Sequence, residues 1–229
     1  SLFLKTHRHP VLDADDVAAL EGAVGRTDKF SAKQIIVRQH TPLTQCTLLL
    51  EGFVERYKDT PEGRRQILAI HVPGDFVDLH SYPLKRLEHS VAALTDVQVA
   101  FFPHSAIRAL TERSATLTEL LWRSTLIDAA INREWIVSIG ARSAVVRLAH
   151  LFCEMYVRLE RIGMTNGFTF ALPFLLPLLE LADAQTPSSP QEPFIRNSLA
   201  FSGIPWISSN PVAFAGTLRL PDPILSPRT

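Results

Sequence analysis

The sequence predicts an α+β protein: a double-stranded β-roll (jelly roll) in the first half, then one long helix, then a mostly helical C-terminal part. Up to residue 102, short runs rich in β-branched and aromatic residues alternate with turn signals, which is typical of barrels and sandwiches. From Ser114 onward, apolar residues instead recur at steps of three and four, and no glycine or proline interrupts residues 105–139. The change of period separates a β domain from a helical segment.

A short amphipathic helix is expected near the N-terminus. Val17, Leu20 and Val24 recur at helical spacing, Asp13 is a suitable cap at the start, and Gly25 ends the run. We expect this helix to lie on the domain that follows it.

Strand-like runs make up the rest of the first half. Turn signals such as Glu51-Gly52 and Pro73-Gly74 separate them. The expected strands cover residues 30–38, 46–51, 53–59, 64–72, 89–94 and 97–102.

A candidate ligand cradle lies between two of these strands. The strand that ends at Val72 breaks at Pro73-Gly74, Asp75 is expected to open one turn of helix, and the chain returns to strand at His89. A helix that starts just after a glycine leaves backbone N–H groups unpaired, and such groups hold anions. The candidate effector-binding residues are Gly74, Asp75, Phe76, Val77, Asp78, Leu79, His80, His89 and Ser90.

Three segments carry a resemblance to a known family: residues 48–54 (LLLEGFV), 63–68 (GRRQIL) and 72–80 (VPGDFVDLH). In combination they make the chain resemble Crp/Fnr-family transcription regulators over residues 30–172. The resemblance implies a cyclic-nucleotide-binding-like β-roll sensor at residues 1–113 and a dimerisation helix at 114–139. It also implies a winged helix-turn-helix that binds DNA, present here as a partial domain at 140–184.

The effector is expected to differ from cyclic AMP or GMP. Cyclic-nucleotide-binding members of the family carry a Gly-Glu pair for the ribose and an Arg-Ser or Arg-Ala for the phosphate. This chain has Gly74-Asp75 at the first place and Glu88-His89-Ser90 at the second. Without a guanidinium there, a phosphate loses its strongest charge-assisted hydrogen bond. We therefore expect an unknown small-molecule effector and no identifiable cofactor, with His89 as the residue that would sense a small anion or pH.

The long helix carries an apolar stripe that has two interpretations. The helix packs on its own barrel, or the stripe meets its copy in a second subunit. The family resemblance implies the second, a homodimer, and the length of the helix favours it. The stripe residues expected at the dimer interface are Leu117, Leu120, Ser124, Ile127, Ile131 and Trp135.

A hinge is expected at Gly140, because glycine destabilises a helix by about 1 kcal/mol relative to alanine. Helix is expected to resume over residues 144–162 and to end at Gly163. A turn and strand should follow around Asn166-Gly167, and residues 175–184 resemble the first helix of a helix-turn-helix. The candidate DNA-contacting residues are Arg142, Ser188, Ser189 and Arg196.

The family pattern stops after Ala184. Residues 185–229 form a proline-rich, atypical tail with eight of the chain's 16 prolines and only three Lys or Arg residues. Because Pro190 and Pro193 would each cost a helix about 3 kcal/mol, no standard recognition helix is expected there. A reading-frame shift or divergence in the gene is one explanation of the tail, and a proline-rich partner-binding segment is the other.

Composition narrows the remaining possibilities. Lys and Arg total 23 and so do Asp and Glu, so no global charge points to nucleic acid or to a membrane surface. Neither the two cysteines nor the histidines His71, His80, His89 and His104 match a metal-ligand spacing, so no metal site is expected. No nucleophile motif accompanies Asp75 and Asp78, so an enzyme is not expected. A cytoplasmic location without membrane association is the default expectation.

Two functional hypotheses follow. The first is a dimeric, effector-responsive DNA-binding transcription regulator of Crp/Fnr type. The alternative is a β-roll dimer whose DNA-reading helix is lost, acting as an interaction module or a relic.

Overall fold

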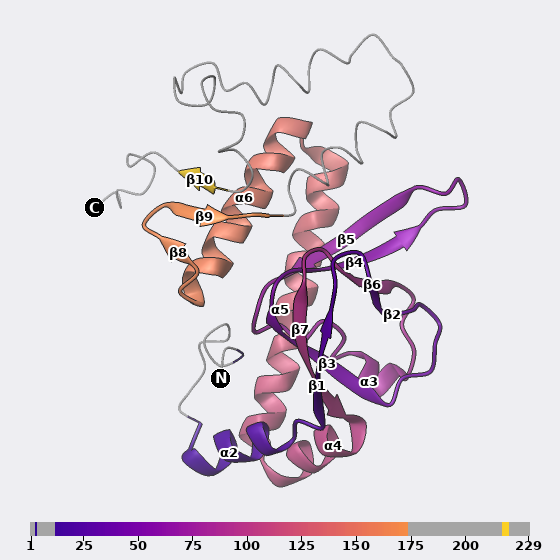
Figure 1. The fold of residues 1–229 in the computed structure, drawn as a ribbon, viewed down its shortest axis with the longest axis vertical. Helices are drawn as coiled ribbons and strands as arrows, with labels where there is room; N and C mark the ends of the chain where they lie inside the picture. The colour runs from indigo at the N-terminus through magenta and orange to yellow at the C-terminus, as the bar shows by residue number, and fades with distance from the viewer. Residues whose placement is uncertain (1–2, 4–11, 174–216, 220–229) are drawn as a thin grey trace. The chain divides into compact units, whose positions relative to one another are not determined.

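The computed structural model describes residues 3, 12–173 and 217–219. The chain forms two compact units, residues 1–142 and 143–229, which are treated separately below. The first unit is a β-roll with helices packed on it (Figure 1), so the predicted α+β class and N-terminal β-roll are confirmed.

The roll is built from two antiparallel sheets. One has the strand order β1-β7-β3 and the other β2-β6-β4-β5. The strands are β1 (Arg26–Phe30), β2 (Ile35–Val37), β3 (Gln45–Glu51), β4 (Val54–Asp59), β5 (Arg65–His71), β6 (Ser90–Ala93) and β7 (Val97–Pro103).

One predicted strand was wrong in extent. Residues 30–38 do not form a single strand, because the chain turns where Gln34 N–H donates to the Ser31 carbonyl over 3.1 Å. Lys33 adopts a left-handed conformation within this turn, with φ 71°. The turn separates β1 from β2 and sends the two strands to different sheets.

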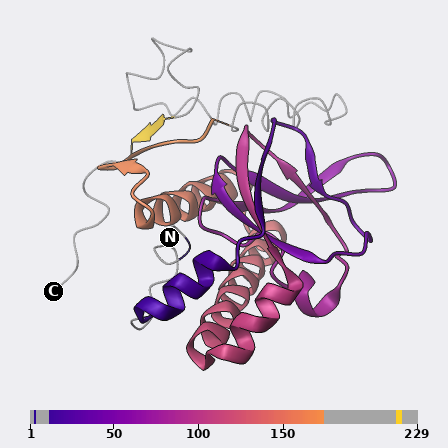
Figure 2. The ribbon, with the colours of Figure 1, turned by 60° about the horizontal axis from the view of Figure 1, so that its bottom comes forward.

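Strand β3 positions the core because its side chains alternate between two faces. Leu49 points into the apolar cluster between the two sheets, together with Val54, Val91 and Val99. Leu48 points the other way, into a second cluster with residues of the helices that cover this sheet (Figure 2). The sheet that contains β3 is therefore buried on both sides.

Helix α2 (Ala14–Gly22) begins as predicted, since Asp13 Oδ1 accepts a hydrogen bond from Asp16 N–H at 2.7 Å. Helix α4 (His104–Arg113) follows β7. Ser114 separates it from the next helix, α5 (Ala115–Ala141). Ser114 is extended, and its Oγ accepts from Leu117 N–H at 3.2 Å, which caps α5.

The predicted helix turn behind Asp75 was wrong. Asp75 closes a tight turn instead: its N–H donates to the Val72 carbonyl, and its carboxylate accepts from Val72 N–H at 3.0 Å. The short helix α3 (Ser81–Leu84) lies six residues further on. The local hydrogen bonds of Asp75 are thus satisfied by the turn.

The hinge predicted at Gly140 was also misplaced, because Gly140 lies within α5. The helix ends after Ala141, where Arg142 turns extended and Ser143 caps α6 (Ala144–Arg161). The second unit continues with the strands β8 (Thr165–Asn166), β9 (Thr169–Ala171) and β10 (Thr217–Arg219), which form one antiparallel sheet. The predicted stop at Gly163 and turn at Gly167 are confirmed, with φ 76° and 58°.

The expected first helix of a helix-turn-helix lies outside the described residues, as does most of the proline-rich tail. No helix among the described residues is long and apolar enough to cross a membrane.

Candidate functional site

A cavity of about 430 Å³ opens between the roll and α5, entirely within the first unit. Its roll side is lined by Arg56 on β4, residues 66–68 on β5, His80, and the Glu88-His89 pair just before β6. Helix α5 contributes Thr125, Asp128, Ala129, Asn132, Trp135, Ile136 and Ile139. A molecule in this cavity would contact the roll and the helix at once.

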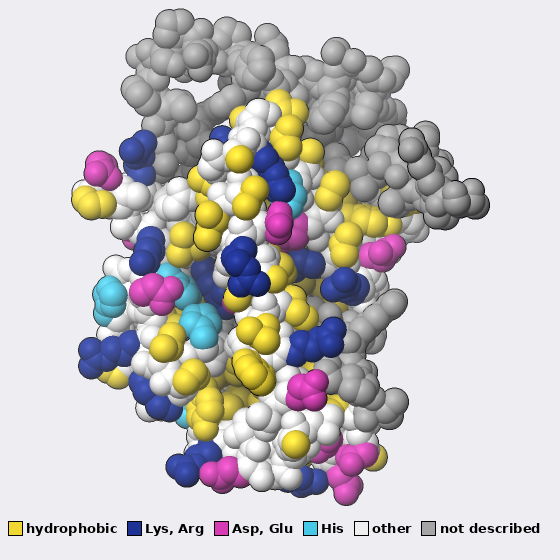
Figure 3. All heavy atoms as spheres, turned by 180° about the vertical axis from the view of Figure 1, so that it is seen from behind, with side chains coloured by type: hydrophobic (Ala, Val, Ile, Leu, Met, Phe, Trp, Pro, Cys, Tyr) yellow, Lys and Arg dark blue, Asp and Glu magenta, His cyan; other side chains and the backbone are white. Residues whose placement is uncertain are grey.

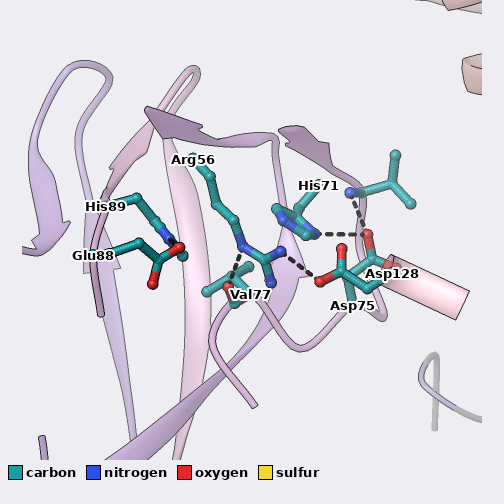
Figure 4. A network of polar contacts seen from close by, with 8 residues as sticks. Arg56, His71, Asp75, Val77, Glu88, His89 and Asp128 are labelled. Atoms are coloured by element: carbon teal, nitrogen blue, oxygen red, sulfur yellow. Dashed lines mark hydrogen bonds and ion pairs between the residues drawn. The ribbon is translucent and has the colours of Figure 1, made fainter. Parts of the chain in front are cut away.

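Arg56 lies at the centre of the polar lining (Figure 4). Its Nε donates to the Val77 carbonyl over 2.7 Å, and its Nη1 pairs with Asp128 Oδ2 of α5 at 2.5 Å. The Arg56 side chain is only 4% exposed. Burial opposes ionisation of the Asp128 carboxyl, but the Arg56 charge outweighs it and lowers the pKa of Asp128. The Asp128 carboxyl is therefore ionised at neutral pH.

His89 and Glu88 form a second polar pair on the roll side. His89 Nδ1 lies 2.9 Å from Glu88 Oε1. Burial lowers the pKa of His89, and although burial alone would raise the pKa of Glu88, its hydrogen bond with His89 helps to bring that pKa down to about 2. At neutral pH a neutral imidazole thus faces a carboxylate. The Nδ1 atom of His89 therefore carries the ring proton and donates a hydrogen bond to Glu88.

His80 lies beside this pair. Its ring centroid is 5.4 Å from that of His89. Burial, with a further contribution from the Arg56 charge, lowers the pKa of His80 to about 4. His80 is therefore uncharged at neutral pH. On the face of the molecule drawn in Figure 3, histidine and acidic side chains lie close together, next to hydrophobic ones.

His71 and Asp75 lie on the opposite side of Arg56 from His89 (Figure 4). His71 Nδ1 is 3.3 Å from Asp75 Oδ2, and both residues are buried away from the cavity lining. Asp78 is also fully buried, where its carboxyl accepts hydrogen bonds from the amide and hydroxyl of Thr47. Burial raises the pKa of Asp78 to about 7. These three groups serve the interior of the roll.

Of the nine predicted effector-binding residues, only His80 and His89 line the cavity. The backbone amides after Gly74, which were expected to hold an anion, are used inside the roll: Gly74 N–H donates to Leu49 and Val77 N–H to Thr47. Six other predicted effector-binding residues are buried: Asp75, Phe76, Val77, Asp78, Leu79 and Ser90. The anion cradle expected in this turn is therefore absent.

The site residues that the sequence did not reveal are Arg56 and Asp128. They are 72 positions apart, and no motif contains either of them. No local signal marks Arg56, because it stands among other charged residues in Glu55-Arg56-Tyr57-Lys58, and only its burial in the fold shows that its charge requires a partner.

The structure also changes the expected dimer stripe of α5. Leu117 and Leu120 are 0% exposed and pack in the core cluster beneath α5, and Ser124 is buried as well. Ile127, Ile131 and Trp135 are half-buried. The first half of the predicted stripe was therefore wrong as an interface, because its side chains are used up against the chain's own roll.

A second stripe of α5 is largely exposed, and two of its members, Ala129 and Ile136, also line the cavity. Trp122 is 66% exposed, Leu126 54% and Ile136 70%. With Ala129 and Arg133 between them, these positions follow alternating steps of four and three, the spacing of a coiled-coil seam. The interpretation that the helix packs on its own roll is confirmed for Leu117 and Leu120, and pairing with a second subunit stays a prediction.

The candidate DNA-contacting residue Arg142 ends α5, where its Nη2 donates to Glu134 over 3.1 Å. Ser188, Ser189 and Arg196 lie outside the described residues. Within the part of the chain that the structure describes, no three His, Cys, Asp or Glu side chains are placed to hold a metal ion.

Comparison with known proteins agrees with this architecture. The family model described as "Cyclic nucleotide-binding domain" matches residues 27–114. The nitrogen fixation regulation protein FixK of Bradyrhizobium diazoefficiens is 26% identical over 172 residues, 75% of this chain and 70% of that protein. The transcriptional activator protein FnrL of Cereibacter sphaeroides is 24% identical over 174 residues, 75% of this chain and 68% of that protein.

Among solved structures, FixK2 from Bradyrhizobium japonicum superposes with a TM-score of 0.58 at 21% identity, covering 72% of this chain and 88% of that one. A β-roll of the cyclic nucleotide-binding class, followed by a long helix, is thus the class that the fold defines. The chain is similar to Crp/Fnr-type regulators: FixK is named as a nitrogen fixation regulation protein and FnrL as a transcriptional activator.

Proposed function

We propose that this chain is a dimeric transcription regulator that binds DNA in response to a small effector in the cavity between the roll and α5. The Arg56–Asp128 ion pair is the observation that carries the proposal. It joins the cavity wall of the roll directly to the helix that leads toward the second unit. A ligand in the cavity that changes this contact would bind more tightly to one position of α5 than to another. Such a difference in affinity is what allows a ligand to shift a protein between two conformations.

The exposed stripe of α5 supports the dimeric part of the proposal. Large apolar side chains exposed at coiled-coil spacing are costly in water and are covered when two helices pair. Pairing through Trp122 and Leu126 leaves Leu117 and Leu120 packed on the roll, while Ile136 belongs both to the stripe and to the cavity lining. A ligand that moves α5 would then also change the contact between the two subunits.

A second candidate function is favoured by the tail. Eight prolines among residues 185–229 argue against a continuous recognition helix in that segment. In this case the chain pairs through α5 but does not read DNA, and it acts as an interaction module. The names FixK and FnrL belong to relatives that are regulators, so this alternative describes a loss of the ancestral reader.

Selection of genomic DNA fragments by the purified full chain tests the proposal. We expect enrichment of a two-fold symmetric sequence, because a two-fold dimer reads two half-sites. Gel-shift titration of the enriched fragment against a scrambled one should then show a specific complex. A chain that dimerises but enriches no sequence would favour the second candidate.

A further inference from the structure

The strongest unexplained feature of the cavity is one nitrogen atom of His89. The residue is 3% exposed, it lines the cavity, and its Nε2 has no hydrogen-bond partner within the described part of the chain. A buried polar atom without a partner costs free energy, and such atoms are usually satisfied by water or by a ligand.

The tautomer of His89 fixes what its Nε2 requires. The Glu88 carboxylate accepts from Nδ1, so a neutral His89 holds its proton on Nδ1 and presents a lone pair at Nε2. The free atom is therefore a hydrogen-bond acceptor, and its natural partner is an N–H or O–H group. A phosphate or carboxylate oxygen offers no donor in its ionised form.

The charges of the lining lead to the same conclusion. Among the described residues around the cavity, two carboxylates, Glu88 and Asp128, face a single guanidinium, that of Arg56. That guanidinium is already paired with Asp128 and bonded to the Val77 carbonyl. An entering anion would have to displace Asp128 and would also meet the carboxylate of Glu88. A neutral or cationic molecule meets neither cost.

The helix side of the cavity adds an apolar wall that includes the planar indole of Trp135. Ile67 and Leu68 of β5 oppose Trp135, Ile136 and Ile139 of α5 around the same space. A volume of about 430 Å³ lies within the usual range for small-molecule sites, which combine apolar walls with a few polar groups. The walls suit a planar aromatic body.

We infer that the cavity takes a neutral or cationic aromatic amine or amide, whose N–H donor is directed at His89 Nε2 and near Glu88, and that it rejects anionic ligands, cyclic nucleotides among them. The inference names the class of effector for the proposed regulator, so its meaning for gene regulation depends on the proposed function. The binding itself requires no DNA.

Three probes of almost equal size and shape separate the charges: benzamidine is cationic, benzamide is neutral, and benzoate is anionic. Titration calorimetry with the full chain, with cyclic AMP as a fourth probe, measures their affinities. For ligands this small we expect dissociation constants on the order of 1–10 mM for benzamidine and benzamide. Benzoate and cyclic AMP should bind at least about tenfold more weakly, a ratio that corresponds to 1.4 kcal/mol.

Two variants locate the effect. His89→Phe keeps an aromatic ring but removes the acceptor, and should reduce benzamide binding by about five- to tenfold. Because His89 is buried and this variant can fail to fold, Glu88→Gln provides a second test at a side chain that is 59% exposed. It keeps an acceptor for Nδ1 but removes a charge, so it should weaken benzamidine and strengthen benzoate.

Equal or tighter binding of benzoate or cyclic AMP would overturn the inference. So would the absence of saturable binding by both donor probes up to about 10 mM, or an unchanged charge preference in Glu88→Gln. A chain that binds benzamide but selects no DNA would refute the proposed function and leave this inference standing. DNA selection without any preference among the probes would do the reverse.

Discussion

The guanidinium of Arg56 and the carboxylate of Asp128 connect the β-roll to the long helix α5, with Nη1 2.5 Å from Oδ2. Arg56 comes from β4, inside the sheet that faces the cavity, and Asp128 comes from the middle of α5. The pair is flanked on one side by His89 and on the other by His71 (Figure 4). Both members of this charge contact also line the cavity.

Removing one member of this pair should destabilise the protein more than removing both. Arg56→Met and Asp128→Leu should each cost about 3 kcal/mol, because each leaves a buried charge without its partner. The double variant should cost at least about 1.5 kcal/mol less than the sum of the two. Urea unfolding followed by circular dichroism measures all three values.

The exposed pair Arg108–Glu112 on α4 is the matched control, with a similar N–O separation of 2.8 Å. Its double-mutant coupling should be below about 0.5 kcal/mol, because exposed pairs are screened by water. Additive costs at Arg56 and Asp128 would contradict the role given to that contact.

Charging the exposed stripe of α5 should separate the proposed dimer. Leu126→Glu places a carboxylate in the middle of the proposed seam, next to its symmetry copy. Light scattering after size exclusion should show a monomer, with the melting temperature of the roll little changed, because Leu126 contributes little to the chain's own core.

Leu84→Glu on α3 is the control for that experiment, since Leu84 is 60% exposed and belongs to a different helix. It should leave the dimer intact. Dissociation by both variants, or by neither, would count against an interface along this face.

The turn at Gly52 should tolerate no side chain. Gly52 has φ 81°, and a Cβ there would overlap the Asp96 carbonyl oxygen and the Thr95 hydroxyl. Gly63 has φ 79° but open space around it. Gly63→Ala should thus cost about 1–2 kcal/mol from the backbone alone, and Gly52→Ala about 2 kcal/mol more. Equal costs in urea unfolding would show that the roll yields easily at Gly52.

Acid should destabilise the protein through its buried histidines. Burial lowers the pKa values of His71, His80 and His89, so the unfolded chain takes up protons from about pH 6.5 downward while the folded chain resists them. Stability should fall as the pH drops from 6.5 toward 4, by up to about 1.4 kcal/mol per pH unit for each group.

Asp78 acts in the opposite direction. Its raised pKa means that the folded chain takes up a proton first, so this group stabilises the fold as the pH falls below 7. The comparison of wild type with His80→Gln isolates the histidine contribution, because Asp78 is common to both. The variant should lose less stability between pH 7 and 5, and an identical loss in thermal melts would contradict the assignment of the effect to His80.

Local sequence patterns determined most of the secondary structure. The cap at Asp13, the strand-like runs of the roll, the start of α5 and the stop at Gly163 each depend on residues within a few positions of one another. Capping, turn formation and side-chain alternation act over that distance, so one sequence suffices to find them. The turn at Asp75 and the end of α5 were missed, because competing local hydrogen bonds there could not be ranked from residue types.

Only the tertiary structure decided the site. The sequence pattern identified one apolar stripe of α5 and could not show which side of the helix the roll covers, because Leu117 and Leu126 are equally apolar. The cavity joins Arg56 of β4, His89 before β6 and Asp128 of α5, which sheet pairing and helix packing bring together across 72 positions. The physical reason is that burial sets both the charge pairing and the free acceptor of His89, and burial is a property of the folded chain.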